Sequence, residues 1–572
     1  MENPQFLIIN THRQHQPYRN PTGDWLGIHY IAAFLNENGI RAMAFAGYAH
    51  EVPELLDEFL PLQSLAAIGF SCDYENRGEV AEFCRRVRSV SRIPIVIGGP
   101  QAAFLEPEFV RETGAAALVC GEGEVTTLEL MMRILIGDND FSAVRGIRFL
   151  KDGKLVATPP RPLIRNLDAL PFPNAKFALG SLFRPTLASF LTGRGCPYSC
   201  SFCYEGGNTG GVRWRSVENV IREISAVLEE RPDIHYLMFT DDTFTVDQER
   251  VKAFCVQLQR LREKYSFTWF CEGHVSTIYG NKDLLRMMID AGLSCLQIGI
   301  ESGDDEVLRA YNKHITAAMI ESVVKDAYDS GLEQLWGNII LGGALETPER
   351  IRKNIEFCRR LYALAPGMIN MDVVHFWPLP GTRITTAPEK FGMKILDPDS
   401  LSSAMDFPVV EYPDLSVQQL CEARTSFMRA LEKAAFDLIP AIPPERVRNL
   451  MTKHNHTSNF SVWLRVIIQT EEYSKFFSLL NCGAAVLSSR ISEKHWRATH
   501  PMRTGHPERF TPDGRLIVHD RELSAGETKI LCLASGKMNW EELLGKSGLP
   551  EEDYKTLLRK LESECLLTFS KY

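Results

Sequence analysis

The stretch Gly193-Arg194-Gly195-Cys196-Pro197-Tyr198-Ser199-Cys200-Ser201-Phe202-Cys203 carries three cysteines spaced C-x3-C-x2-C, directly after the strand-like run 187–191. Three thiolates on one short loop can hold three corners of a cubane iron–sulfur cluster, where four cysteines would normally close it. The missing fourth ligand would leave one iron open, as a catalytic metal site keeps a position that a structural site closes. The alternative is half of a zinc site, but no second Cys or His pair follows at zinc-like spacing.

The length, net charge and apolar runs of the chain limit the classes of protein to which it can belong. Its 572 residues exceed one ordinary hydrophobic core and suggest roughly three or four domains. The net charge of −9 provides no global basic field for nucleic acid or an anionic membrane. No run approaches the roughly 18 apolar residues of a membrane span. The N-terminus has no basic segment before an apolar stretch, so no signal peptide is expected.

Cysteine usage indicates the cellular compartment. Of the fourteen cysteines, eleven lie outside the C-x3-C-x2-C loop and are scattered singly, many among apolar neighbours such as Val119 and Leu531. Buried reduced thiols explain this distribution better than disulfides do. A reducing cytoplasm is therefore the expected location, and an oxygen-sensitive cluster would require one.

Residues 1–140 alternate short apolar runs with helix-like segments, the pattern of a parallel sheet covered on both faces. Strands are expected at 6–9, 41–46, 66–71, 93–97 and 115–120, and helices at 25–38, 78–90 and 124–136. This α/β pattern predicts a doubly wound, Rossmann-like domain that binds its ligand at the carboxyl ends of the strands. A nicotinamide cofactor is not expected, because the first strand leads into Thr11-His12-Arg13 instead of G-x-G-x-x-G.

The ligand of this first domain would meet the residues that follow its strands. The candidate contacts are Thr11, Ser71, Gly98, Gly99, Pro100, Gln101, Gly121, Glu122 and Glu124. Glycines at such positions let the backbone approach a ligand closely. Two alternatives remain: a doubly wound domain that has lost its ligand, or one that only docks onto the next domain.

After a proline-rich linker at 141–186, strand and helix patterns alternate six times over 187–385. The expected strands are 187–191, 234–240, 268–271, 295–300, 336–341 and 371–377. Six parallel βα units predict an open, partial TIM barrel with reactive groups at the carboxyl ends of its strands.

The region 386–520 is expected to be a mostly helical extension and a possible substrate region, with helices at 418–438 and 459–469. Its basic and aromatic stretch 495–509 fits a solvated loop best, with contact to an acidic substrate or to a cofactor as the alternative.

Residues 521–572 read as three short helices at 524–533, 539–546 and 551–564 followed by a strand, which predicts a winged-helix-like module. DNA binding is disfavoured because the segment 550–554 is acidic. A structural cap and a reader of leader peptides both remain open.

Several motifs together resemble the cobalamin-dependent radical S-adenosylmethionine (SAM) enzymes. They are the cysteine loop, 21–27, Gly98-Gly99-Pro100, Gly121-Glu122-Gly123-Glu124, 213–216, 312–313 and 380–382. The chain departs from the family where the third barrel strand ends in Glu272-Gly273-His274 and where 344–347 reads Ala-Leu-Glu-Thr. The D-x-H-x-x-G motif of other cobalamin proteins is absent, so no lower axial ligand of cobalt is assigned.

The resemblance implies three cofactors: a 4Fe-4S cluster, S-adenosylmethionine and cobalamin. Cys196, Cys200 and Cys203 would hold the cluster, and its open iron would chelate the methionine part of SAM. The implied SAM contacts are Phe202 near the adenine, Asp241 and Asp242, Glu301, Asn338 and Ile340. The residues after the strands of the first domain would contact cobalamin. For each carboxylate, a strand-end acid satisfied by a helix N-terminus is an equally good interpretation. Acid–base candidates near the barrel mouth are Tyr204, Glu272, His274 and His375.

The function that the resemblance implies is methylation of an unactivated carbon through methylcobalamin and a 5′-deoxyadenosyl radical. The substrate would be a peptide or a natural-product intermediate, and an electron donor such as flavodoxin or ferredoxin would reduce the cluster. One alternative is a cobalamin-dependent cyclase or ring rearrangement without methyl transfer. A second, from another class of protein, is a non-catalytic cobalamin or peptide sensor. Neither nucleic acid nor a membrane is expected as a partner.

Overall fold

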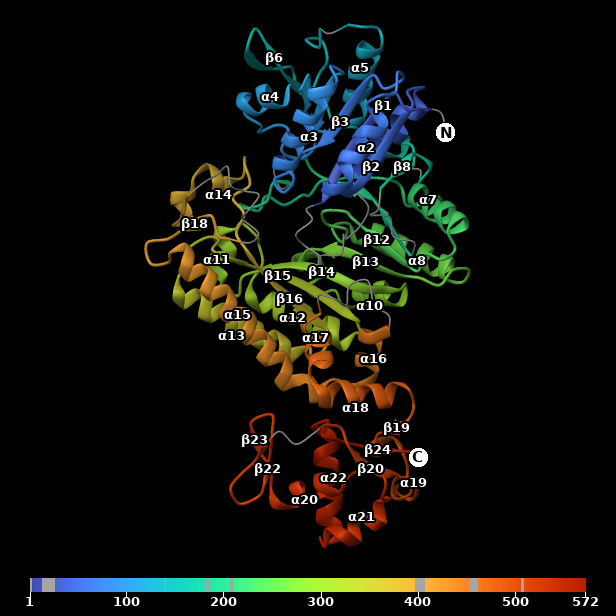
Figure 1. Cartoon of the computed structure of the whole chain (residues 1–572), viewed down its shortest axis with the longest axis vertical. Coiled ribbons are helices and arrows are strands. Elements are labelled where there is room, and N and C mark those ends of the chain that lie inside the picture. The colour runs from blue at the N-terminus through green and yellow to red at the C-terminus, as the bar shows by residue number, and fades with distance from the viewer. Residues whose placement is uncertain are drawn as a thin grey trace. The chain divides into compact units, whose positions relative to one another are not determined.

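The computed structural model describes residues 3–12, 26–138, 140–173, 175–180, 186–205, 210–396, 407–452, 461–505 and 509–571. The motif residues 21–23 and part of the stretch 495–509 lie outside these ranges. The chain divides into two compact units, one of 1–354 with 371–426 and one of 355–370 with 427–572 (Figure 1). Among the described residues, no helix has the length and apolar character needed to cross a membrane.

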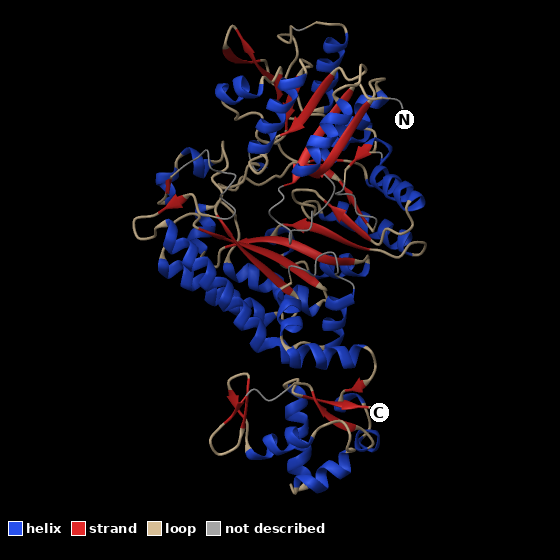
Figure 2. Ribbon diagram, viewed as in Figure 1, coloured by secondary structure: helices blue, strands red, loops and turns tan. Residues whose placement is uncertain are grey.

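The first unit begins with the expected doubly wound sheet, whose strand order is β7-β6-β5-β4-β3-β1-β2-β8. Its parallel strands are β1 Phe6–His12, β2 Ala42–Tyr48, β3 Ala67–Ser71, β4 Ile95–Gly98 and β5 Ala117–Val119. The helices are α1 Leu26–Glu37, α2 Val52–Phe59, α3 Arg77–Val90, α4 Pro107–Thr113 and α5 Glu124–Leu135. Figure 2 shows helices beside these strands.

Alternation of side chains along β1 explains why both faces of this sheet need helices. Leu7 and Ile9 belong to one apolar cluster, while Phe6 and Ile8 belong to another that includes residues of α1. Because successive residues of a strand point to opposite faces, an apolar run buries both. The predicted fold class is confirmed.

The linker differs from its prediction, because 141–186 contributes strands to this sheet. They are β6 Ile147–Lys151, β7 Lys154–Ala157 and β8 Ala178–Leu179. β5, β6 and β7 pair antiparallel, and the β6–β7 turn places Asp152 and Gly153 at positive φ. Asp-Gly is a preferred pair for such two-residue hairpin turns.

The predicted partial barrel follows as a sheet of order β16-β15-β14-β13-β12-β9. The strands are β9 Leu187–Phe190, β12 Tyr236–Phe239, β13 Thr268–Gly273, β14 Leu293–Glu301, β15 Gln334–Leu341 and β16 Ile369–His375. The pairs from β9 to β15 are parallel. The connecting helices are α7 Val217–Glu230, α8 Gln248–Arg262, α9 Val275–Ile278, α10 Lys282–Asp290, α11 Asp305–Ala310, α12 Ala317–Asp329 and α13 Pro348–Leu364. All carboxyl ends in such a sheet share one edge, where the predicted site lies.

The C-terminal helices match the sequence. α20 Ala525–Leu533, α21 Trp540–Ser547 and α22 Glu551–Ser563 precede β24 Leu567–Ser570. Ser524 and Asn539 begin α20 and α21 with capping boxes.

The boundary of this module and the solvated loop need correction. β19 Ala485–Val486 and β20 His500–Arg503 pair with β24, so the sheet recruits residues well before 521. α19 Glu493–Arg497 lies between them, and Trp496 is buried in the same core as Trp540 and Phe569. A loop in solvent would not bury an indole, so 493–503 is part of the packed module.

Candidate functional site

The cysteine loop begins in a short hairpin formed by β10 Gly193–Arg194 and β11 Arg213–Trp214. Its middle is tied to the end of α11, because the Ser201 amide donates to the Tyr311 carbonyl at 2.8 Å. The Asn312 side chain also donates to the Ser199 carbonyl at 3.0 Å. The loop that carries the cysteines is therefore held at its start by the hairpin and at its middle by the residues after α11.

The three thiols fit a cubane cluster better than a single ion. Cys196, Cys200 and Cys203 are partly buried and reduced. Within the ranges that the structure describes, no three His, Cys, Asp or Glu side chains converge on one metal ion. The thiolates of a cubane bind separate irons and need not converge on one point, whereas zinc ligands must. Burial raises the pKa of Cys200 to about 11, opposed by the Lys313 ammonium.

Glu301, a predicted SAM contact, lies at the end of β14 with a φ of 60°, a strained conformation for a glutamate. Its carboxylate accepts from Lys313 Nζ at 2.8 Å, and both side chains are buried. A Cβ added at Gly299 would lie 2.2 Å from each of these polar groups. The pair therefore has a close-fitting backbone beneath it. Lys313 is an additional site residue, which the sequence marks only as part of the motif 312–313.

The two aspartates after β12 have different partners. Asp241 accepts hydrogen bonds from the amide, at 2.6 Å, and the hydroxyl of Thr192, so its carboxylate joins the ends of β9 and β12. The prediction that Asp241 contacts SAM stays a prediction. Asp242 accepts from the Gly195 amide at 3.1 Å, next to Cys196. Asp242 thus orients the cysteine loop and keeps carboxylate capacity for a ligand.

All four acid–base candidates have shifted pKa values, and burial raises the pKa of Tyr204 above its usual value. Burial, followed by the neighbouring Asp242 charge, raises the pKa of Glu272 to about 7. Burial lowers the pKa of His375 to about 4 and that of His274 to about 3. Both imidazoles are therefore neutral at pH 7 and weak as bases. Among these candidates Glu272 has the pKa best suited to proton transfer near neutrality.

The remaining predicted residues lie around the cysteine loop and on β15. The Phe202 ring contacts the Tyr311 ring edge-on at 4.9 Å, and Lys313 lies 5.7 Å from its centroid. Tyr204 packs edge-on against Phe104 of the first domain, with centroids 5.8 Å apart. On β15, Asn338 is half-buried and Ile340 is buried.

The loops after β3 and β4 form a cradle of small residues that fits the predicted cobalamin. Gly99 has a φ of +93°, and a Cβ there would lie 2.6 Å from the Cys72 carbonyl oxygen and 2.9 Å from Ser71 Oγ. Gly99 and Pro100 are exposed, and Gly98 is half-buried. Gln101 is buried, and its Oε1 has no hydrogen-bond partner in the described part of the chain. Buried amide oxygens normally accept a hydrogen bond, so this oxygen indicates a donor that is missing from its surroundings.

Two further strand ends border this cradle. Thr11 is buried at the end of β1, where its carbonyl accepts from Asn76. Asn76 also donates to the Ser71 carbonyl at 2.9 Å, so the Asn76 side chain links the end of β1 to the end of β3. Gly121, after β5, has a φ of +88° and open space where a Cβ would stand. These loops are thus preorganised for a bulky ligand.

Replacing Gly99 by Ala is expected to weaken cobalamin binding about tenfold, because the left-handed backbone and the Cβ clash displace the loop. The measurement is the dissociation constant for hydroxocobalamin, followed by its absorption. Gly78→Ala is the control, since Gly78 lies in α3 with no heavy atom within 4 Å of an added Cβ. An unchanged affinity in Gly99→Ala would remove this loop from the cobalamin site.

The side chains of Glu122 and Glu124 are bound by arginines of the β10–β11 hairpin. Arg194 donates to Glu122 at 3.0 Å and to Glu124 at 2.5 Å, and Arg213 donates to Glu122 at 2.8 Å. All four side chains are at most 16% exposed. We call Glu122, Glu124, Arg194 and Arg213 the latch. It joins the loop after β5 to the strand that leads into Cys196, and the contact of the two carboxylates with cobalamin stays a prediction.

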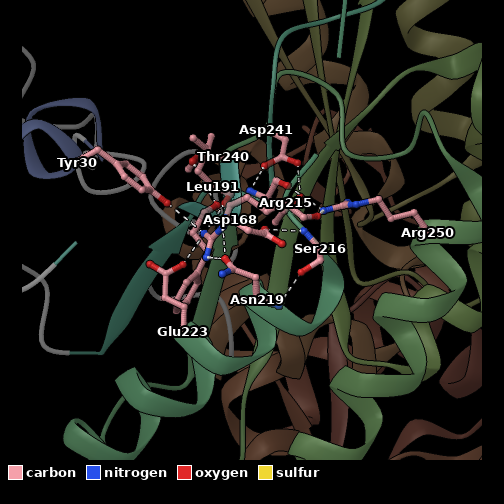
Figure 3. Close-up of polar contacts among 12 residues, drawn as sticks. Tyr30, Asp168, Leu191, Arg215, Ser216, Asn219, Glu223, Thr240, Asp241 and Arg250 are labelled. Atoms are coloured by element: carbon pink, nitrogen blue, oxygen red, sulfur yellow. Dashed lines mark hydrogen bonds and ion pairs between the residues drawn. The ribbon is translucent and has the colours of Figure 1, made fainter. Parts of the chain in front are cut away.

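A second network centred on Arg215 supports the same junction (Figure 3). Its guanidinium donates to Glu223 at 2.5 Å, to the Tyr30 hydroxyl at 3.1 Å and to the Leu191 carbonyl at 2.8 Å. Asn219 accepts two further bonds from it. Arg215 therefore connects α1 of the first domain with β9 and α7 of the barrel. The sequence marked 213–216 as a motif, but gave no role to its arginines.

Comparisons with known proteins agree with this architecture. Residues 190–358 match the radical SAM superfamily, and residues 19–131 match the B12 binding domain. An uncharacterized methyltransferase of Pyrococcus horikoshii is 29% identical over 377 residues, which is 64% of this chain and 78% of that protein. An anaerobic magnesium-protoporphyrin IX monomethyl ester cyclase of Rubrivivax gelatinosus is 28% identical over 297 residues, covering 50% of this chain and 52% of that protein.

Two solved structures have a similar fold. The radical SAM methyltransferase TsrM of Kitasatospora setae, solved with cobalamin and a [4Fe-4S] cluster, gives a TM-score of 0.58 at 17% identity, covering 76% of this chain and 89% of TsrM. The cobalamin-dependent SAM radical enzyme OxsB, solved with aqua-cobalamin and SAM, gives a TM-score of 0.60 at 15% identity, covering 84% of this chain and 74% of OxsB. The chain thus joins a segment that matches the B12 binding domain to one that matches the radical SAM superfamily and carries the C-x3-C-x2-C loop, and its fold is similar to the folds of TsrM and OxsB.

Proposed function

We propose that this enzyme transfers a methyl group to an unactivated carbon of a small natural-product intermediate or a peptide. The observation that carries the proposal is the latch, which bonds the loop after β5 directly to the strand entering the cysteine loop. The cobalamin and cluster loops are thereby parts of one junction. Forming a substrate radical and methylating it at the same carbon requires both cofactors to reach one substrate position.

When bound, SAM with the cluster supplies a 5′-deoxyadenosyl radical and cobalamin supplies the methyl group, chemistry that side chains alone cannot provide. The contribution of this chain is positioning. Asp242 holds the Gly195 amide beside Cys196, and the Glu301–Lys313 pair lies under the barrel mouth. Glu272, with a pKa of about 7, can take up or release a proton there near neutrality.

The test is product stoichiometry with SAM labelled in its methyl group, under anaerobic conditions and with flavodoxin or ferredoxin as electron donor. Methyl transfer predicts about one 5′-deoxyadenosine and one S-adenosylhomocysteine for each labelled product, because one SAM forms the radical and a second replaces the methyl group. Labelled product without 5′-deoxyadenosine would contradict the radical step of this proposal.

A second candidate function is a cobalamin-dependent cyclisation or rearrangement. It is favoured by the similarity to the Rubrivivax gelatinosus cyclase, although the chain spans only about half the length of that relative. In this case the same assay would give 5′-deoxyadenosine with no stoichiometric S-adenosylhomocysteine and no labelled carbon in the product. The two functions are therefore separated by one experiment.

A further inference from the structure

A short hydrogen-bonded chain connects the cysteine loop to the end of β13. Tyr198, which lies between Cys196 and Cys200, places its hydroxyl 3.1 Å from Ser276 Oγ. Ser276 Oγ in turn lies 2.8 Å from His274 Nδ1. The Tyr198 and His274 rings are stacked, with centroids 3.8 Å apart and planes 17° from parallel. Stacking and hydrogen bonding together fix the imidazole against the loop.

The direction of this chain follows from one backbone contact. His274 caps the N-terminus of α9, and its Nδ1 accepts from the Ser276 amide at 3.3 Å. Because an amide N–H can only donate, Nδ1 carries no proton, and the proton of the neutral imidazole is on Nε2. The Ser276 hydroxyl can then donate to Nδ1 and accept from Tyr198.

The chain therefore ends in a donor, the Nε2–H of His274. His274 is only 5% exposed, and its Nε2 has no hydrogen-bond partner among the residues that the structure describes. Leaving a buried donor without an acceptor is unfavourable, so a fixed and unused donor of this kind indicates a ligand.

The surroundings of His274 indicate which ligand accepts this hydrogen bond. The buried Lys313 ammonium lowers the pKa of His274, in addition to the larger effect of burial. The same ammonium acts on the thiols of Cys200 and Cys203. The stacked Tyr198 ring likewise feels the charges of Cys196 and Cys200. His274 is therefore linked to the cysteine loop through its stacked neighbour Tyr198 and through Lys313.

We propose that His274 donates a hydrogen bond from Nε2 to a sulfur atom of the cluster on Cys196, Cys200 and Cys203, and so raises its reduction potential. This inference rests on the assignment of those cysteines as cluster ligands. Hydrogen bonds to cluster sulfurs tune the potential of iron–sulfur clusters, because they stabilise the more negative reduced form. His274 is thus assigned to electron uptake by the cluster, instead of the acid–base role expected from the sequence.

Two conservative variants isolate the donor. His274→Asn places its amide oxygen near the position of Nδ1, so it can keep the cap of α9 while removing the donor at the Nε2 position. His274→Gln reaches further and keeps an N–H near the Nε2 position. Tyr198→Phe retains the ring and removes only the hydroxyl, which is the start of the chain. Each variant is compared with the wild type at equal iron content, so that failed cluster assembly is recognised separately.

The measurement is the midpoint potential of the reconstituted cluster without SAM, followed by electron paramagnetic resonance. At a fixed applied potential, we expect the ratio of reduced to oxidised clusters to be about tenfold lower in His274→Asn than in the wild type. For a one-electron couple, this corresponds to a midpoint potential that is about 59 mV lower. His274→Gln should stay close to wild type, and Tyr198→Phe should shift the potential less than His274→Asn does, because it loosens the chain but keeps the Nε2 donor. SAM affinity is measured in parallel.

Three results would overturn the proposal. An unchanged potential in His274→Asn with weaker SAM binding would assign the donor to the SAM carboxylate. An unchanged potential and unchanged SAM affinity would assign it to a water molecule. Equal shifts in His274→Asn and His274→Gln would indicate a structural effect. Failure of the wild type to bind about four irons would instead reject the cluster assignment, and with it the proposed function.

Discussion

Cys200→Ala is expected to abolish reductive cleavage of SAM, with a loss of at least about a thousandfold in 5′-deoxyadenosine formation. Cys200 is the middle cysteine of the loop, and an alanine leaves one iron of the cubane without its thiolate. The cluster supplies the electron that the protein cannot. The measurements are the iron content after anaerobic reconstitution, expected to fall well below about four per chain, and the rate of 5′-deoxyadenosine formation.

Cys482→Ala is the matched control, since Cys482 is an exposed thiol in the other compact unit and should keep the full iron content. Full biological activity of Cys200→Ala would contradict the enzymatic interpretation. It would favour a sensor that binds cobalamin or peptide without using a cluster.

Arg215→Met is expected to destabilise the first unit by about 3–5 kcal/mol, because it leaves the Glu223 carboxylate buried without its cation. The two side chains are 3% and 5% exposed and lie 2.5 Å apart. The free energy of unfolding is measured in urea from the midpoint and slope of the transition. The double variant Arg215→Met with Glu223→Leu should recover much of the loss, since neither charge is then left alone.

The control for this prediction is Arg85→Met, which breaks an ion pair with Glu112 whose side chains are 59% and 47% exposed. Its effect should stay within about 0.5 kcal/mol, because exposed pairs are screened by solvent. Equal effects of the two substitutions would mean that the Arg215 network does not hold the unit together.

The sheets were predictable because their signal is local. Apolar runs such as Phe6–Ile9 bury both faces of a strand, and this pattern appears directly in the sequence. The β6–β7 hairpin was missed because its strands are partly exposed and carry Lys151 and Lys154, so they lack an apolar run.

The partners of polar side chains were not predictable, because they depend on contacts between distant segments. The sequence marks Glu122, Glu124 and Asp241 as strand-end acids, but only the fold shows that arginines and Thr192 bind them. Arg194 and Glu124 are 70 residues apart, and Tyr198 and Ser276 are 78 apart. The spacing of the cysteines, by contrast, is a property of one loop and was read from the sequence alone.

The latch makes the two cofactor sites thermodynamically reciprocal. Glu122 and Glu124 follow the last parallel strand of the B12-binding domain, while Arg194 stands two residues before Cys196. If cobalamin fixes the loop after β5, we expect these ion pairs to pass part of that free energy to the cluster loop. Linkage would then require an equal reverse effect, so assembly of the cluster would strengthen cobalamin binding by the same factor. Such coupling would favour the state in which both cofactors are present over either half-loaded form.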